Sequence, residues 1–366
     1  MKIIADDKIP FLKGIPESFA EVIYLPGATI DSDQVKDADA LLIRTRTQCN
    51  EALLHGSSVR FIGTATIGMD HIDIDFCKKN KIYVTNAPGC NADSVAQYIL
   101  SSLLSLSLKN GFSLQDKTAG IIGVGNVGKK VKACLEKTGM NVLLNDPPRA
   151  EKEQGFVDLK TISEACDIIT FHPPLTRSGK YPTYHLGNEK FFHSLKKRPI
   201  ICNSSRGEVI DTESLKKSFA DRLLSHMIID CWENEPHIDL SILHDAYIST
   251  PHIAGYSTDG KMNATRMIIQ SLSDFFHLDI DLSQLRLPDF PNNIIDMNAF
   301  PDHRTENAIL ATYDPISDSN LLKKDPIDFE KFRNQYGIRR EYPAYSIKNA
   351  TPEESKALSE LGFTCI

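Results

Sequence analysis

The stretch Gly120-Ile-Ile-Gly123-Val-Gly125-Asn-Val-Gly128 decides the fold of this 366-residue chain. The run that leads into it is β-branched, and residues 129–138 after it favour a helix. In such a strand–turn–helix unit, Gly123 permits the tight turn, Gly125 lets the backbone approach a diphosphate, and Gly128 lets the helix pack closely on the strand. The N–H groups at the start of the helix favour an anion. The pattern therefore predicts a dinucleotide site formed by Gly123, Gly125, Asn126, Val127 and Gly128.

An acidic residue follows at the position that distinguishes the two nicotinamide dinucleotides. Asp146 ends the next expected strand, about 20 residues beyond Gly125. A carboxylate there accepts hydrogen bonds from ribose hydroxyls and repels a 2′-phosphate. The sequence therefore favours NAD as the cofactor over NADP. Arg149 is the counter-indication, because a nearby arginine can accommodate that phosphate.

Short β-rich runs recur along the chain in two series. The first series fills the first ninety residues at a spacing of about 20 residues, which suits βαβ units and a parallel sheet. The second begins at residue 118, and its six runs match the strand count of a doubly wound dinucleotide domain. The expected strands are 2–5, 21–25, 40–44, 59–65 and 82–86 in the first series, and 119–124, 141–145, 167–171, 199–203, 226–230 and 246–250 in the second.

The remaining segments suggest how these series are divided into domains. A helix around residues 95–108 is apolar on most of its circumference and is expected to lie buried between two layers. Residues 257–278 favour a second long helix, and residues 279–291 contain two prolines and little periodicity, as in a linker. We expect a substrate domain of residues 1–93 and 257–280, a Rossmann-type NAD domain of residues 94–256, and a small C-terminal domain of residues 287–366.

Composition excludes several classes of protein. Hydrophobic residues make up 41% of the chain, as in a soluble globular protein, and the formal net charge of −7 argues against nucleic-acid binding by bulk charge. No run approaches the ~20 apolar residues that a membrane span needs. The eight cysteines are irregularly spaced and form no C-x-x-C pair, so we expect reduced thiols, no metal site and a cytoplasmic location.

Three later strand ends each carry one polar residue suited to catalysis. Arg206, Glu235 and His252 follow the fourth, fifth and sixth strands of the second series. Because ligands bind at the carboxyl ends of parallel strands, we expect these residues to converge on the cofactor. His252 suits a base that takes a hydroxyl proton while hydride leaves, Glu235 would orient the imidazole, and Arg206 offers a planar fork for a carboxylate or keto oxygen.

Each of these residues also has a purely structural interpretation. Arg206 alone could form a surface ion pair, Glu235 could start a helix before Pro236, and His252 could be a hydrogen-bonded loop histidine. Their combination, in this order and behind a dinucleotide turn, predicts a dehydrogenase that acts on a 2-hydroxy acid.

The chain resembles the NAD-dependent D-2-hydroxyacid dehydrogenase family and, within it, the erythronate-4-phosphate dehydrogenases of vitamin B6 biosynthesis. The resemblance covers nearly the full length and is most specific through residue 256. It implies an α/β fold with a doubly wound NAD domain, a flavodoxin-like substrate domain and a small α+β C-terminal domain that forms a homodimer. The segments that carry it are Gly63–Asp73, Ala87–Asn91, Gly111–Leu114, Asn145–Ala150, Phe171-His172, Ser249–Tyr256 and the cluster Arg339-Arg340-Glu341.

This resemblance implies a reaction and a role for each matching residue. The reaction converts 4-phospho-D-erythronate and NAD into 2-oxo-3-hydroxy-4-phosphobutanoate and NADH. Arg206, Glu235 and His252 match the catalytic residues. Two positions depart from the family pattern: Thr45 replaces a usual serine and keeps the hydroxyl, whereas Pro173 replaces a usual threonine and has neither N–H nor hydroxyl. Cofactor contacts are implied for Asp146, Pro173, Ser204, Asp230 and Gly255, and substrate contacts for Thr45, Thr66 and Tyr256.

A phosphorylated substrate needs a local cation in a chain of net charge −7. Arg44 ends the third expected strand, and we hypothesise that it binds the substrate phosphate with help from Thr45. The alternative is that Arg44 forms an ion pair with a nearby acid such as Asp70.

Two other functions stay open at this point. A phosphoglycerate dehydrogenase would share the core and a similar substrate, but its larger forms often carry a βαββαβ C-terminal domain, whose order of elements the tail here does not fit. A dinucleotide-sensing scaffold would keep the fold without catalysis, although the intact Arg206, Glu235 and His252 set argues against it.

Overall fold

The computed structural model describes residues 1–291 and 293–366, and its internal contacts group the chain into two compact units. Unit 1 consists of Met1–Asn91 and Ser257–Asp289, and unit 2 consists of Ala92–Tyr256 and Phe290–Ile366. The chain thus leaves unit 1 and later returns to it. The division into three domains stays a prediction, because these contacts group the C-terminal residues with the second strand series.

Unit 1 is built on a five-stranded parallel sheet in the order β2-β1-β3-β4-β5. This is the flavodoxin-like order expected for the substrate domain. Helices α1–α3 cover one face and the long helix α11 covers the other, so the central strands are buried on both sides. The bounds are β1 Lys2–Asp6, α1 Ser32–Val35, β2 Glu21–Leu25, β3 Ala40–Ile43, α2 Glu51–Leu54, β4 Phe61–Thr64, α3 Ile74–Lys79, β5 Tyr83–Thr85 and α11 Thr258–Phe276.

Unit 2 contains a six-stranded parallel sheet in the order β11-β10-β9-β8-β6-β7. The chain crosses from β7 on one side of β6 to β8 on the other, so the switch point for ligand binding lies between β6 and β8. Beyond β7, a backbone hydrogen bond from Val157 to Leu144 stands where a further strand would pair. The strands are β6 Thr118–Ile122, β7 Asn141–Asn145, β8 Ile168–Phe171, β9 Ile200–Asn203, β10 His226–Ile229 and β11 Ile248–Ser249.

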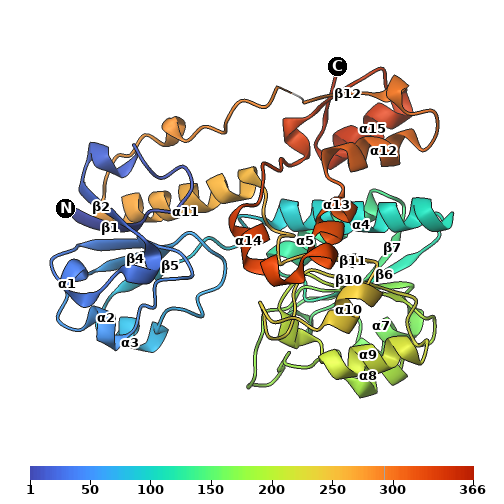
Figure 1. Cartoon of the computed structure of the whole chain (residues 1–366), viewed down its shortest axis with the longest axis horizontal. Helices are drawn as coiled ribbons and strands as arrows, with labels where there is room; N and C mark the ends of the chain where they lie inside the picture. The colour runs from blue at the N-terminus through green and yellow to red at the C-terminus, as the bar shows by residue number, and fades with distance from the viewer. Residues whose placement is uncertain (292) are drawn as a thin grey trace. The chain divides into compact units, whose positions relative to one another are not determined.

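Helices cover both faces of this sheet (Figure 1). The helices of this part are α4 Ala92–Asn110, α5 Asn126–Glu136, α6 Pro147–Ala150, α7 Leu159–Ala165, α8 Glu189–His193, α9 Thr212–Ala220 and α10 Leu240–Asp245.

The bounds of several elements differ from those expected. Helix α5 begins at Asn126, three residues before the expected 129, because Gly125 itself is the N-cap and the helix starts directly from the glycine turn. Most expected strands end one or two residues early, where the chain turns into a loop.

The C-terminal residues add a small layer to unit 2. Three short parallel strands in the order β12-β13-β14 pack with helices α12 and α15. Helix α4 packs against α5 and also against α12 and α13, so it is buried along most of its length, as its apolar sequence predicts. The bounds are β12 Ile294–Asp296, α12 Arg304–Thr312, α13 Pro315–Lys324, α14 Phe329–Asn334, β13 Ser346–Lys348, α15 Pro352–Leu361 and β14 Thr364–Cys365.

Helix α13 also covers the open edge of the six-stranded sheet. It lies beside β11 (Figure 1). There the Ser319 hydroxyl accepts a hydrogen bond from the Ser249 N–H at 3.0 Å. This contact satisfies an edge N–H that would otherwise be free to pair with another strand. None of the described helices is both long enough and apolar enough to cross a bilayer.

A buried histidine lies at the switch point of this sheet. His172 follows β8, its N–H donates to the Ile122 carbonyl at 2.7 Å, and its Nε2 lies 2.8 Å from the Thr170 hydroxyl. Burial lowers the pKa of the His172 imidazole to about 3. The folded protein therefore keeps this residue neutral at pH values where the unfolded chain protonates it.

We expect His172 to make unit 2 less stable in mild acid. The unfolded chain takes up the proton near pH 6.5 and the folded one near pH 3, so stability falls as the pH drops through this window. Going from pH 7 to pH 5 costs about 2 kcal/mol through this residue. Urea unfolding of the wild type and His172→Asn at both pH values measures the effect. If the free energy of unfolding changed by the same amount between pH 7 and pH 5 in both proteins, the lowered pKa of His172 would be contradicted.

Candidate active site

The glycine turn between β6 and α5 has the geometry of a phosphate-binding loop. A Cβ at Gly123 would lie 2.4 Å from the Pro173 nitrogen, and one at Gly128 would lie 2.2 Å from the Gly123 carbonyl oxygen. Both positions therefore accept only glycine. At Gly125 a Cβ would meet nothing within 4 Å, so the backbone faces open space at the N-terminus of α5. The turn thus fits the diphosphate of a dinucleotide.

Asp146 stands next to this turn, as the spacing predicts. Its carboxylate accepts hydrogen bonds from the Val124 N–H at 2.8 Å and the Arg149 N–H at 3.2 Å. Arg149, the counter-indication to NAD, forms an ion pair with Glu153 and donates to the Val124 carbonyl at 2.6 Å. Its guanidinium is therefore already paired within the protein.

A cavity of about 660 Å³ opens beside Asp146. Its size lies in the range of cofactor pockets, and its walls are mostly apolar with a few polar groups, which suits an adenosine. The residues present therefore fit an NAD molecule, and Pro173 forms part of the wall. The lining residues that matter here are Gly123, Asp146, Pro173, Tyr181 and Leu186.

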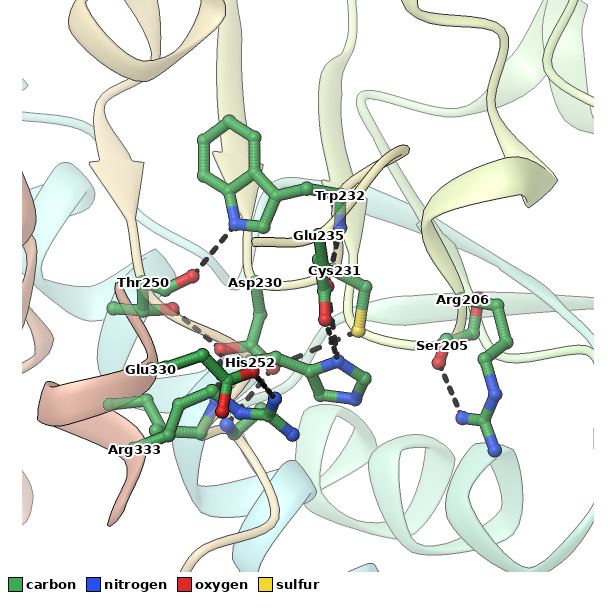
Figure 2. Close-up of polar contacts among 12 residues, drawn as sticks. Ser205, Arg206, Asp230, Cys231, Trp232, Glu235, Thr250, His252, Glu330 and Arg333 are labelled. Carbon is green, nitrogen blue, oxygen red and sulfur yellow. Dashed lines mark hydrogen bonds and ion pairs between the residues drawn. The ribbon is translucent and has the colours of Figure 1, made fainter. Parts of the chain in front are cut away.

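His252 and Glu235 form a hydrogen-bonded pair at the carboxyl edge of the same sheet. Nδ1 of His252 lies 2.9 Å from Oε2 and 3.1 Å from Oε1 of Glu235 (Figure 2). Burial alone would raise the pKa of Glu235, but the charge and hydrogen bond of His252, with the Trp232 N–H, hold that pKa below its ordinary value. Glu235 is therefore a carboxylate that orients the imidazole, which leaves Nε2 as the ring nitrogen for chemistry.

Asp230 anchors the loop that carries His252. It is 1% exposed, and it accepts hydrogen bonds from the Thr250 hydroxyl at 2.7 Å, the Ile253 N–H at 2.8 Å and the Ala254 N–H at 3.0 Å. Burial raises the pKa of Asp230 even so. The anchoring keeps His252 at a φ of 55°, a left-handed conformation that is strained for a residue other than glycine.

The loop that carries Arg206 lies directly against the loop that carries Glu235. A Cβ on Gly207 would lie 1.9 Å from the carbonyl carbon of Trp232. Only glycine therefore allows the backbones of these two loops to lie so close together. Arg206 donates from Nη1 to the Ser205 carbonyl at 2.8 Å, and its charge opposes the rise that burial causes in the pKa of the Cys231 thiol. Two of the three predicted catalytic residues, Arg206 and Glu235, thus stand on touching loops, and Glu235 binds the third.

The other predicted site residues of unit 2 lie around this centre. Ser204 places its hydroxyl 3.4 Å from Nδ1 of His172, next to the wall formed by Pro173. Gly255 and Tyr256 follow the His252 loop, and the Tyr256 hydroxyl accepts a hydrogen bond from Arg333. Asp230 acts here as an anchor, and the cofactor contacts implied for Asp230, Ser204 and Gly255 stay predictions.

The predicted substrate residues of unit 1 form their own local contacts. Arg44 donates from Nη1 to the Lys8 carbonyl at 3.2 Å, and among the described residues it has no ion pair with Asp70. Thr66 donates to the Gly68 carbonyl at 3.0 Å, and Thr45 is exposed. Their roles in substrate binding stay predictions.

Two arginines of the C-terminal residues were not predicted as part of this site. Arg333 of α14 contacts Tyr256, and Arg339 donates to the carbonyls of Ile253 and Ala254. The sequence offered one signal, the charged cluster around Arg339, which the resemblance linked to dimerisation. In the structure Arg339 is buried against residues 250–254, the loop that carries His252 and is called the catalytic loop below.

Two groups of side chains among the described residues have the spacing of metal ligands. They are Cys231 with Glu235 and His252, and His185 with Asp211 and Glu233. Each group already contains a His–Glu hydrogen bond, and the second of these is 2.7 Å long. The expectation of no metal stays a prediction.

Comparisons with known proteins show the family of this chain. Residues 101–254 match the family described as D-isomer specific 2-hydroxyacid dehydrogenase, NAD binding domain, and residues 286–362 match a domain of unknown function, DUF3410. Among solved structures, NAD-bound 3-phosphoglycerate dehydrogenase from Entamoeba histolytica aligns with a TM-score of 0.65 at 27% identity, covering 79% of this chain and 99% of its own. D-lactate dehydrogenase from Aquifex aeolicus, complexed with NAD and lactic acid, gives a TM-score of 0.61 at 23% identity, covering 78% and 97%.

Curated relatives match over nearly the whole chain. Erythronate-4-phosphate dehydrogenase of Bacteroides fragilis is 51% identical over 350 residues, covering 95% of this chain and 99% of its own length. The enzyme of the same name from Porphyromonas gingivalis is 45% identical over 367 residues, covering 99% and 100%. This NAD-dependent oxidoreductase therefore belongs to the erythronate-4-phosphate dehydrogenase family of the D-isomer specific 2-hydroxyacid dehydrogenases.

Proposed function

We propose that the protein oxidises 4-phospho-D-erythronate to (R)-3-hydroxy-2-oxo-4-phosphooxybutanoate in vitamin B6 biosynthesis. The Glu235–His252 pair carries this proposal, because it stands at the carboxyl edge of a sheet whose glycine turn and cavity fit NAD. The near full-length relatives that bear the name of this activity support it.

The chemistry divides between cofactor and protein. When bound, NAD supplies the acceptor for the hydride that leaves C2 of the substrate. His252 takes the proton of the C2 hydroxyl at Nε2, because Nδ1 is held by Glu235. Glu235 stabilises the positive charge that the imidazole then carries. Arg206 binds the substrate carboxylate and the developing keto oxygen with its planar fork.

Four further residues are proposed to contact the substrate. Tyr256 follows the catalytic loop and is the one nearest in sequence to His252. Arg44, Thr45 and Thr66 belong to unit 1, where Arg44 has only a backbone carbonyl as its hydrogen-bond acceptor among the described residues. A guanidinium without a carboxylate partner is available to an anion, which supports a phosphate-binding role.

The assembly and location of the enzyme are also proposals. We propose a homodimer formed through residues 287–366. Five of the nine large hydrophobic side chains that are exposed among the described residues lie there: Ile294, Leu321, Ile327, Ile338 and Ile366. We propose a cytoplasmic location, since all eight cysteines are free thiols and six of them are buried.

The proposed function predicts a substrate preference. The purified protein should form NADH from 4-phospho-D-erythronate with a kcat/KM at least 100-fold above that for 3-phosphoglycerate, measured by absorbance at the NADH band. The reverse preference would identify a phosphoglycerate dehydrogenase. A lack of NADH with any 2-hydroxy acid would support a dinucleotide-sensing scaffold instead.

Removal of the catalytic imidazole should abolish most of the turnover. We expect His252→Ala to lower kcat by about 10²–10⁴-fold, because a positioned acid–base group contributes that much, while NAD affinity measured by fluorescence stays the same. His185→Gln is a matched control, because His185 forms a similar pair with Glu233 at 2.7 Å and has no proposed role in the reaction. Near-normal turnover of His252→Ala would rule out the assignment.

The role of Arg44 has its own test. Arg44→Ala should raise KM for 4-phospho-D-erythronate about 10-fold or more, because it removes charge-assisted hydrogen bonds to the phosphate. Arg60→Ala is the control in the same unit, since Arg60 is already paired with Asp39 at 3.0 Å. An unchanged KM in Arg44→Ala would show that the phosphate is bound elsewhere.

A further inference from the structure

The C-terminal residues place a second cation at the catalytic centre. Arg333 belongs to α14, and its Nη2 donates to the Tyr256 hydroxyl at 3.2 Å. Both residues belong to unit 2. Figure 2 shows Arg333 with Glu330 in the same view as the His252–Glu235 pair. The charge of Arg333 lowers the pKa of Glu235 and opposes the rise in the pKa of Cys231, so the guanidinium lies within electrostatic reach of the catalytic pair.

Few acceptors inside the protein hold this guanidinium. Nη1 forms an ion pair with Glu330 at 3.1 Å, and Nη2 donates a hydrogen bond to the Tyr256 hydroxyl. Nε is buried without a hydrogen-bond acceptor among the described residues. The side chain is 23% exposed, so part of it reaches solvent. Arginine carries five N–H donors, and these contacts leave several of them for a ligand. Arg339 is different, because it is 4% exposed and is directed to backbone carbonyls.

The surroundings of Arg333 suit an anion with several oxygens. Its guanidinium carbon lies 5.8 Å from the centre of the Tyr256 ring and 6.0 Å from that of Phe329, so aromatic rings flank the charge. A phosphate monoester carries about −1.5 to −2 charges at pH 7 and accepts hydrogen bonds at three oxygens. A planar guanidinium binds such a group with two parallel hydrogen bonds, and the Tyr256 hydroxyl lies 3.2 Å from Nη2 of this guanidinium.

The position of Arg333 in the sequence points to substrate specificity. The match to the general 2-hydroxyacid dehydrogenase family ends at residue 254, before Tyr256, whereas α14 lies within the match to the C-terminal domain at residues 286–362. Both residues thus lie outside the segment that this chain shares with that family. We propose, building on the function proposed above, that Arg333 binds the phosphoryl group of the substrate together with Tyr256, in addition to the contact proposed for Arg44, and so determines specificity for phosphorylated 2-hydroxy acids.

Kinetics with and without the phosphate test this proposal on the full-length enzyme. We expect Arg333→Met to raise KM for 4-phospho-D-erythronate by about 10- to 100-fold, because it removes a charge-assisted pair, and to lower kcat/KM at least 10-fold more for this substrate than for unphosphorylated D-erythronate. Arg333→Lys should recover part of the loss, since it restores the charge without the fork. Inorganic phosphate, used as a competitive inhibitor, should bind the Arg333→Met variant at least 10-fold more weakly.

A charge-matched control is available on the same helix. Lys331→Met also removes one positive charge from α14, but Lys331 is exposed and paired with Asp328 at 2.7 Å, so all three measurements should equal those of the wild type. A thermal melt and NAD affinity confirm that each variant folds.

Each alternative result has a definite meaning. Equal losses with the phosphorylated and unphosphorylated substrates would show that Arg333 only positions the catalytic loop, and an unchanged KM would show that it does not meet the phosphate. Either result overturns the proposal while the proposed function stands. Failure of the wild type to oxidise 4-phospho-D-erythronate would instead overturn the proposed function.

Discussion

The buried Asp230 carboxylate is the group on which the geometry of the site depends. Its oxygens receive two backbone N–H groups and one hydroxyl from the loop after β11, on both sides of His252. Burying a carboxylate is costly, and these three donors offset part of that cost. With the loop anchored in this way, His252 has a left-handed backbone conformation and its Nδ1 faces Glu235.

The C-terminal residues hold the same loop from the other side. Asp230 binds the N–H groups of Ile253 and Ala254, and Arg339 donates to the carbonyls of these two residues. The backbone after His252 is therefore clamped between a buried anion and a buried cation. A buried arginine without acceptors would be strongly destabilising, so the loop and the C-terminal residues stabilise each other. The domain of unknown function thus supports the catalytic geometry, besides any role it has between subunits.

The parts of the fold that the sequence predicts are those set by local patterns. Strands β2 and β7 have the expected bounds residue for residue, and Gly123, Asp146, Glu235 and His252 stand as their spacing indicates. The start of α5 was wrong by three residues because glycine served as its N-cap. Arg333 and Arg339 contact Tyr256 and Ile253, which lie 77 and 86 positions earlier in the sequence. Periodicity shows which face of an element is apolar, but not which distant element it will contact.

Charge links the acid–base pair to the proposed phosphate site. Glu235 stays ionised because its pKa is lowered, so it binds the Nδ1 hydrogen of His252 in either protonation state and only Nε2 changes. Arg333 contributes to that lowering, so the proposed phosphate site and the acid–base pair are linked electrostatically. A phosphate dianion bound to Arg333 would offset its positive charge. Binding of the proposed substrate would therefore change the electrostatic field at Glu235, the residue that orients the catalytic imidazole.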